Sequence, residues 1–154
     1  QRPMLLVGGS GWSKTASANV LSFATRHSIP VATSFRRQDA IDNKSSVFCG
    51  TLGTSVSPKL LKRIKEVDVL IVLGSRLGEM TTQGYQIIGG HETNQKLIHI
   101  HVDPNELGAV YSPDLAVVSS VENFSSVLTN LHVDQASGWR GWCKMVRGEY
   151  VEDL

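Results

Sequence analysis

At 154 residues, with 41% hydrophobic and 19% charged residues, the chain has the length and composition of one globular domain with a single core. Its 15 Lys and Arg residues against 14 Asp and Glu residues give a net charge of +1, so no long-range field attracts nucleic acid or an anionic membrane. No apolar run reaches the roughly twenty residues that span a bilayer, and no secretory leader is recognisable, so we expect a cytoplasmic protein.

Short apolar runs recur along the chain and predict β-strands buried on both faces, because the runs are continuous rather than alternating. Between them, apolar residues recur with helical spacing over residues 16–27, 60–67 and 121–131. Strand and helix therefore alternate, which predicts an α/β fold: a doubly wound, six-stranded, mostly parallel sheet with helices on both faces (Rossmann-like). The predicted strands are residues 4–7, 29–32, 47–49, 69–73, 97–102 and 115–118.

Boundary signals accompany these elements. Ser57-Pro58 and the segment from Ser119 to Glu122 are typical of helix starts, and residues 103–108 predict a short helical turn that ends at a glycine. Residues 74–95 are rich in glycine and threonine and lack periodicity, so we expect a long loop there that is functional or mobile.

The last part of the chain has a different character. We expect a nucleotide-binding-like domain over residues 1–131 and a C-terminal tail over residues 132–154. Apolar side chains at helical spacing predict an amphipathic helix in the tail, which needs a surface to pack on. Because few residues precede the first strand, we also expect the chain to be an excised segment of a longer polypeptide. The side chains of the helix stripe are Trp139, Trp142, Val146 and Tyr150.

Two of the predicted strands end in glycines: residues 5–11 (LLVGGSG) and residues 70–78 (LIVLGSRLG). Glycines let a backbone approach a phosphate or ribose closely, and in an open parallel sheet two such ends meet where the strand order reverses. We therefore expect a nucleotide crevice at these turns. A tight strand-to-helix turn that needs glycine for its own geometry is the alternative.

Two common nucleotide motifs fit the first turn poorly. The dinucleotide fingerprint would need a third glycine where Lys14 stands, and residues 31–34 offer no acid for a ribose, which disfavours an NAD site. A phosphate-binding P-loop would need a glycine at Ser13.

Imidazoles and thiols have simple structural interpretations here. His99 and His101 lie on one face of a predicted strand and Asp103 follows, which is a metal-ligand spacing, but no further cluster completes a site. We expect buried or edge histidines, with Asp103 as a helix cap. Cys49 and Cys143 are far apart in sequence and predict two free thiols.

Arginines near the predicted strand ends are candidates for anion binding. Arg76, just after the fourth predicted strand, can bind a phosphate through two parallel hydrogen bonds, and a salt bridge to Glu79 or Glu106 is its alternative role. The segment 36–39 (RRQD) lies at the level of the same crevice, where its arginines face an anion or solvent. No nucleophile with a partnered base and no carboxylate pair is recognisable, so we expect no catalytic residue in this chain.

The order of five segments resembles the central domain of thiamine-diphosphate-dependent enzymes of the acetolactate synthase family, over roughly residues 2–131. Each segment is unspecific alone, whereas all five in this order and spacing are specific. The segments are PMLLVGG (3–9), IPVATS (29–34), GTLGT (50–54), DVLIVLGSRL (68–77) and IHIHVDPNELG (98–108).

The resemblance implies a domain that lies between two thiamine-binding domains of one chain and holds FAD in a largely structural role. Those flanking domains would carry thiamine diphosphate and Mg²⁺, so we expect this chain to be inactive alone. We expect the parent, a homo-oligomer, to decarboxylate a 2-oxo acid and join the product to an acceptor. The cofactor-binding positions implied are Gly8, Gly9, Ser34, Phe35, Arg36, Gly50, Gly74, Arg76 and Glu106; no catalytic or metal-binding residue is implied.

Several residues depart from the pattern of the flavin-binding members, and each departure removes a hydrogen-bond partner of the flavin. Related enzymes with other substrates bind ADP or nothing, so FAD, an ADP-like ligand and an empty crevice remain alternatives. A self-standing NAD- or nucleotide-binding enzyme and a ligand-free interaction module are the rival functions. The departures are Ser10 for a glycine, Leu52 for a histidine, Gly78 and Met80 for an acid and a base, and His101 and Ser120 for acids.

Overall fold

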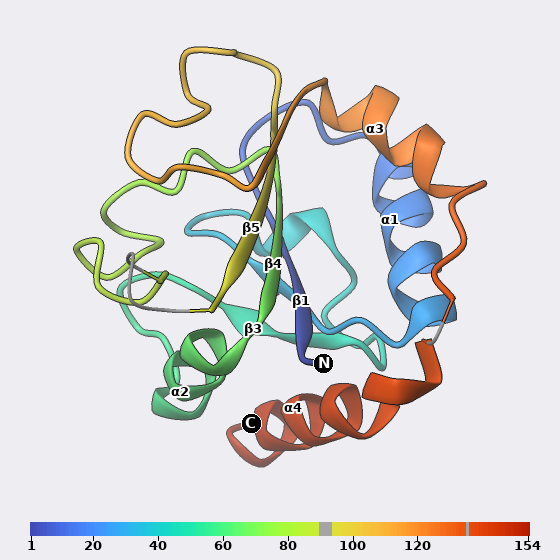
Figure 1. The fold of residues 1–154 in the computed structure, drawn as a ribbon. Helices are drawn as coiled ribbons and strands as arrows, with labels where there is room; N and C mark the ends of the chain where they lie inside the picture. Colours follow the sequence, from blue (N-terminus) through green and yellow to red (C-terminus); the bar gives the residue numbers. More distant parts are fainter. Residues whose placement is uncertain (90–93, 135) are drawn as a thin grey trace.

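The computed structural model describes residues 1–89, 94–134 and 136–154, and in it strands and helices alternate as far as β4, after which β5 and β6 follow with no helix among the described residues between them (Figure 1). No helix in these ranges is long and apolar enough to cross a membrane. The strands are β1 (Pro3–Val7), β2 (Val31–Thr33), β3 (Phe48–Thr51), β4 (Val69–Leu73), β5 (Lys96–His101) and β6 (Leu115–Val118). The α-helices are α1 (Lys14–His27), α2 (Pro58–Glu66), α3 (Val121–Leu128) and α4 (Arg140–Glu152).

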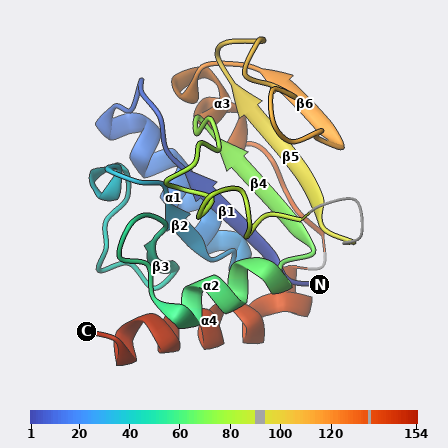
Figure 2. The same cartoon turned by 90° about the vertical axis from the view of Figure 1, so that its left-hand side faces the viewer.

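The sheet has the strand order β3-β2-β1-β4-β5-β6, and all of these neighbouring strands pair in parallel (Figure 2). At the end of β1, Val7 is in register with Thr33 of β2 and Leu73 of β4. The chain winds outward in one direction from β1 and in the other from β4, so the order reverses between these two strands. This confirms the predicted doubly wound α/β fold.

Each face of the sheet has its own core because successive strand side chains point to opposite faces. In β1, Met4 and Leu6 pack toward α2 and α4, whereas Leu5 and Val7 pack toward α1 and α3. All four are at most 1% exposed. The continuous apolar runs of β1 and β2 therefore reflect burial from both sides, as predicted. The prediction is wrong for β6, which lies at the edge of the sheet, with Leu115 52% and Val118 60% exposed.

The predicted free thiols are also found. Cys49 and Cys143 are buried and form no disulfide, and burial raises the pKa of the Cys143 thiol to about 11. Neither thiol is therefore a ready nucleophile at neutral pH.

The second strand begins later than predicted, at Val31 rather than Ile29, for a local reason. Helix α1 ends at His27, and the next residue, Ser28, has a left-handed backbone with φ of 53°. The N–H of Ile29 then donates to the carbonyl of Ala24 at 2.9 Å. Ile29 thus completes the helix end before the chain can extend.

Two other expected features differ. Residues 103–108 form hydrogen-bonded turns that do not continue as a helix, although Asp103 Oδ1 accepts from the Asn105 N–H at 2.9 Å in the capping role expected of Asp103. Helix α3 ends at Leu128, which leaves Leu131 outside the helix and 44% exposed. Residues 90–93 of the predicted loop and residue 135 of the predicted tail lie outside the described residues.

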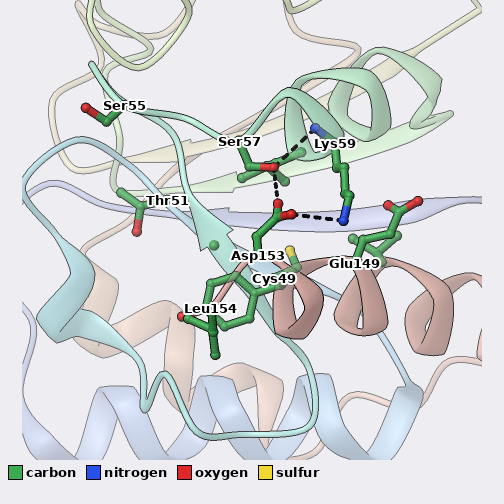
Figure 3. A pocket seen from close by; sticks show the side chains of 12 residues that line it. Cys49, Thr51, Ser55, Ser57, Lys59, Glu149, Asp153 and Leu154 are labelled. Carbon is green, nitrogen blue, oxygen red and sulfur yellow. Dashed lines mark hydrogen bonds and ion pairs between the residues drawn. The ribbon is translucent and has the colours of Figure 1, made fainter.

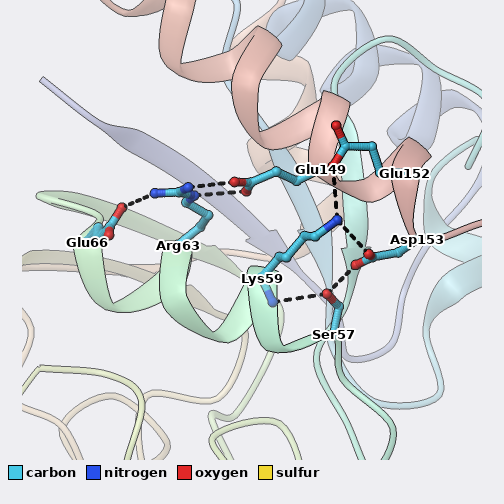
Figure 4. A network of polar contacts seen from close by, with 7 residues as sticks. All are labelled: Ser57, Lys59, Arg63, Glu66, Glu149, Glu152 and Asp153. Atoms are coloured by element: carbon cyan, nitrogen blue, oxygen red, sulfur yellow. Dashed lines mark hydrogen bonds and ion pairs between the residues drawn. The ribbon is translucent and has the colours of Figure 1, made fainter.

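The amphipathic tail helix packs against the domain as α4, beneath the start of the sheet (Figure 1). The indole N–H of Trp142 donates to the Pro3 carbonyl at 2.8 Å, and that of Trp139 donates to the His27 carbonyl at 2.7 Å. Its polar side faces α2, where Arg63 Nε donates to Glu149 Oε2 at 2.8 Å (Figure 4). The tail therefore has a partner surface within this chain.

Replacing Trp142 by alanine tests this docking. Trp142 is only 8% exposed, so its loss removes a large apolar contact and leaves the Pro3 carbonyl without its donor. We expect the free energy of unfolding in urea to fall by about 3–5 kcal/mol. Met145→Ala, at a position 40% exposed on the same helix, is the control and should cost under about 0.5 kcal/mol. Equal effects of the two changes would mean that α4 is not docked.

The Arg63–Glu149 pair makes this docking pH-dependent. The Arg63 guanidinium lowers the pKa of Glu149, so the pair stabilises the fold above the ordinary pKa of 4.5 and loses its effect as pH falls through the lowered value. We expect Glu149→Gln to cost about 1–2 kcal/mol at neutral pH and progressively less in acid, by urea unfolding at several pH values. Glu152→Gln, at a carboxylate 70% exposed, is the control and should show a far smaller difference.

Candidate functional site

The turns after β1 and β4 meet backbone to backbone where the strand order reverses. A Cβ atom on Gly9 would lie 1.9 Å from the Gly74 carbonyl oxygen, and one on Gly74 would lie 2.4 Å from the Gly8 carbonyl oxygen. Gly9 and Gly74 also have positive φ, 72° and 81°. These positions therefore require glycine, and the predicted meeting of the two turns is confirmed.

A cleft of about 770 Å³ opens above these turns, within the size range of small-molecule sites. Residues at four strand ends line it. They are Gly9 and Ser10 after β1, Ser34, Phe35 and Arg37 after β2, part of the segment 74–85 after β4, and His101 at the end of β5. Elements far apart in sequence thus converge on one cleft, which we call the crevice.

Five of the nine predicted cofactor-binding residues line the crevice, namely Gly9, Ser34, Phe35, Gly74 and Arg76. Gly8 lies beneath it, since a Cβ there would lie 1.8 Å from Ser34 Oγ. Glu106 is not a lining residue but contacts one, with its Oε1 3.9 Å from Arg76 Nη1. This contact is the salt bridge named as the alternative role of Arg76.

Gly50 is not a lining residue of the crevice. It lies in a separate cavity of about 220 Å³ between β3, α2 and α4, where Ser57, Lys59 and Asp153 form a polar network (Figure 3). A Cβ on Gly50 would lie 3.2 Å from a Leu60 methyl carbon. This glycine therefore serves the packing of β3 against α2.

Arg37, rather than the predicted Arg36, lines the crevice. The Arg37 N–H donates to the Ser34 carbonyl at 3.0 Å, which closes a four-residue turn. Within it Arg36 has a left-handed backbone, with φ of 62°, and its exposed guanidinium lies 5.0 Å from the centre of the Phe35 ring. The pair of adjacent arginines signals a basic turn, but nothing in the sequence shows that Arg36 takes a positive φ.

The histidines of β5 are buried at the side of the crevice, as expected. His99 is 2% exposed, its Nε2 lies 2.7 Å from the Ser75 carbonyl oxygen, and burial lowers its pKa. His101 Nδ1 accepts from the Asp103 N–H at 3.0 Å. That bond places any proton of a neutral His101 ring on Nε2. Across the described ranges, no three or more His, Cys, Asp or Glu side chains are grouped to hold a metal ion.

The segment after β4 forms the far wall of the crevice and reaches across the sheet. The Phe35 N–H donates to Thr81 Oγ1 at 3.3 Å, and Gln83 Nε2 donates to the Gly53 carbonyl. Leu77 anchors the wall at 1% exposure, whereas Tyr85 is 46% exposed at the rim. The described part of the predicted loop is thus an ordered wall, and its tyrosine was not recognised as a site residue from sequence.

Residues 1–131 match the family model described as "Thiamine pyrophosphate enzyme, central domain". The chain belongs to this family. This match confirms the family expected from the five sequence segments. The structure adds that this central domain has a crevice where the strand order reverses.

Curated relatives agree with this assignment. An acetolactate synthase large subunit from Parasynechococcus marenigrum is 28% identical over 79% of the chain and 19% of its own length. An acetolactate synthase large subunit from Cyanidium caldarium is 26% identical over 90% of the chain and 25% of its own length. A sulfoacetaldehyde acetyltransferase from Alcaligenes xylosoxydans xylosoxydans is 34% identical over 70% of the chain and 18% of its own length. The chain therefore spans a quarter or less of these relatives.

Two glycines of the first turn give a matched test of the backbone contact. Both have positive φ, but a Cβ on Gly9 would overlap Gly74 whereas one on Gly11 has nothing within 4 Å. Gly11→Ala should cost about 1–2 kcal/mol from the left-handed backbone alone. Gly9→Ala should cost about 3–5 kcal/mol because strain and overlap add, by urea unfolding. Similar losses at both positions would show that the two turns do not touch.

Proposed function

We propose that this central domain is the scaffold of an acetolactate-synthase-like thiamine-diphosphate enzyme, and that its crevice holds the diphosphate of FAD or ADP. The observation that carries the proposal is the crevice at the strand reversal, where two glycine turns and two arginines converge. Nucleotides bind at this position in open parallel sheets. In this proposal the parent decarboxylates a 2-oxo acid and joins the product to an acceptor.

The residues of the crevice fit a diphosphate. Arg76 has a side chain 70% exposed and a loose contact to Glu106, so its guanidinium is free to bind phosphate oxygens. Arg37 approaches from the turn after β2, and Glu79 is the carboxylate that also lines the crevice. Glycine turns leave room for phosphate oxygens beside the backbone. The balance of the lining favours an anion.

The catalytic cofactor is assigned to other domains in this proposal. Thiamine diphosphate, bound with Mg²⁺ between the flanking domains of a homo-oligomer, would supply the electron sink for decarboxylation. This chain would contribute rigid spacing between those domains and, through Arg37 and Arg76, the hold on the nucleotide. The family match does not support the self-standing NAD-processing enzyme or the ligand-free module.

Titration of the 154-residue chain with ADP and with FAD, by calorimetry, tests the nucleotide part. We expect saturable binding of at least one of them, weakened about tenfold by Arg76→Gln through loss of a charge-assisted contact. Arg140→Gln, at an exposed arginine that begins α4, is the matched control and should leave the affinity unchanged. Failure of both nucleotides to bind would contradict the proposed holder. Activity of the full-length gene product on pyruvate, with and without thiamine diphosphate, tests the parent reaction.

A further inference from the structure

Arg37 is positioned in the crevice by its backbone rather than by its own side-chain contacts. Its N–H donates to the Ser34 carbonyl at 3.0 Å, and its carbonyl accepts from the Ala40 N–H at 3.1 Å. Two consecutive turns thus hold the Arg37 backbone from both sides. The side chain is 28% exposed, so most of its surface is covered by the protein.

The guanidinium of Arg37 makes no hydrogen bond to the residues that the structure describes. Its Nε is shut off from solvent and has no partner among the described residues. Among the described residues its charged partner is Asp39, with 3.4 Å between Arg37 Nη2 and Asp39 Oδ2, and no hydrogen bond joins the two side chains. A guanidinium so placed needs an acceptor with two oxygens, which a single loosely placed carboxylate oxygen does not provide.

We propose that Arg37 is the residue that selects for phosphate in the crevice, and that Asp39 is its resident counter-ion, which a ligand phosphate displaces. This inference rests on the proposed nucleotide site and adds the regulation of its affinity. In the free protein Asp39 neutralises Arg37 and weakens the hold on simple anions. A diphosphate offers several oxygens to the planar guanidinium and displaces the carboxylate.

The exposure of Asp39 makes this displacement inexpensive. Its side chain is 70% exposed, so the carboxylate returns to water when it leaves Arg37. Exposed ion pairs are weak, which limits how strongly Asp39 competes. Removing the Asp39 charge should therefore raise affinity by a small factor, whereas removing Arg37 should lower it by a large one.

Four forms of the 154-residue chain test this inference: the unchanged chain, Arg37→Gln, Asp39→Asn and the double variant. Each is titrated with ADP, FAD, inorganic pyrophosphate and adenosine by calorimetry, after its melting temperature shows that it is folded. We expect Arg37→Gln to weaken ADP and pyrophosphate about tenfold. Asp39→Asn should strengthen both about two- to fivefold. Adenosine should bind equally to all four forms because it carries no phosphate.

The double variant separates the pair from a general charge effect. With Arg37 already replaced, Asp39→Asn should change the affinity for ADP by less than about twofold. An equal gain in both backgrounds, or no gain in either, would overturn the counter-ion role of Asp39. Unchanged ADP binding by Arg37→Gln would overturn the phosphate-selecting role of Arg37.

The outcomes also distinguish this inference from the function on which it rests. If ADP and FAD bind but Asp39→Asn changes nothing, the counter-ion role is wrong and the nucleotide site stands. If Asp39→Asn binds pyrophosphate but no form binds ADP or FAD, the nucleotide site is wrong and the anion site stands. If neither the unchanged chain nor Asp39→Asn binds any of these ligands, both are wrong.

Discussion

The contact between the turns after β1 and β4 is the constraint on which the rest of the site depends. A Cβ on Gly74 would lie 2.4 Å from the Gly8 carbonyl oxygen and 2.8 Å from a methyl carbon of Val121, so the same point also fixes the start of α3. Ser34, after β2, packs against Gly8 on the other side. Because the turns after β1 and β4 meet without intervening side chains, the floor of the crevice between them is backbone, which lets a phosphate approach closely.

The tail helix gives the opposite end of β1 an equivalent anchor. Pro3 begins β1, and its carbonyl is bonded to the indole of Trp142 in α4. The family match stops at residue 131, yet Trp142 and Val146 belong to the same core as Met4 and Leu6. The structural unit in this chain is therefore larger than the matched segment. Strand β1 is held at one end by α4 and at the other by the glycine contact, so the floor of the crevice rests on a strand fixed at both ends.

The fold was predictable from the sequence because most strands are largely buried on both faces and are therefore continuous apolar runs, and because β1 and β4 are followed directly by glycine. Site residues were less predictable. Their positions depend on backbone torsions: the positive φ of Arg36 turns its side chain outward and leaves Arg37 in the crevice. Gly50 is conformationally special as well, with φ of 117°, but it serves helix packing. A glycine or an arginine at the right place in a motif does not by itself tell which cavity it faces.

The residues that depart from the flavin-binding pattern differ in whether they can reach a ligand. Leu52 is in the core, fully buried, and has no access to a ligand. The other departures line cavities. Ser10, Gly78, Met80 and His101 line the crevice. Ser120 lines an adjoining cavity of about 230 Å³, which Ser10 and His101 also line. By the family resemblance, three of the departures replace acids, the side chains that recognise sugar hydroxyls, whereas Arg37 and Arg76 face the crevice. In the proposed nucleotide site, the loss of these acids beside Arg37 and Arg76 shifts recognition from the sugar toward the phosphates. On this proposal the crevice holds its ligand mainly through the diphosphate, and the group beyond the diphosphate contributes less to binding than in the flavin-binding family members.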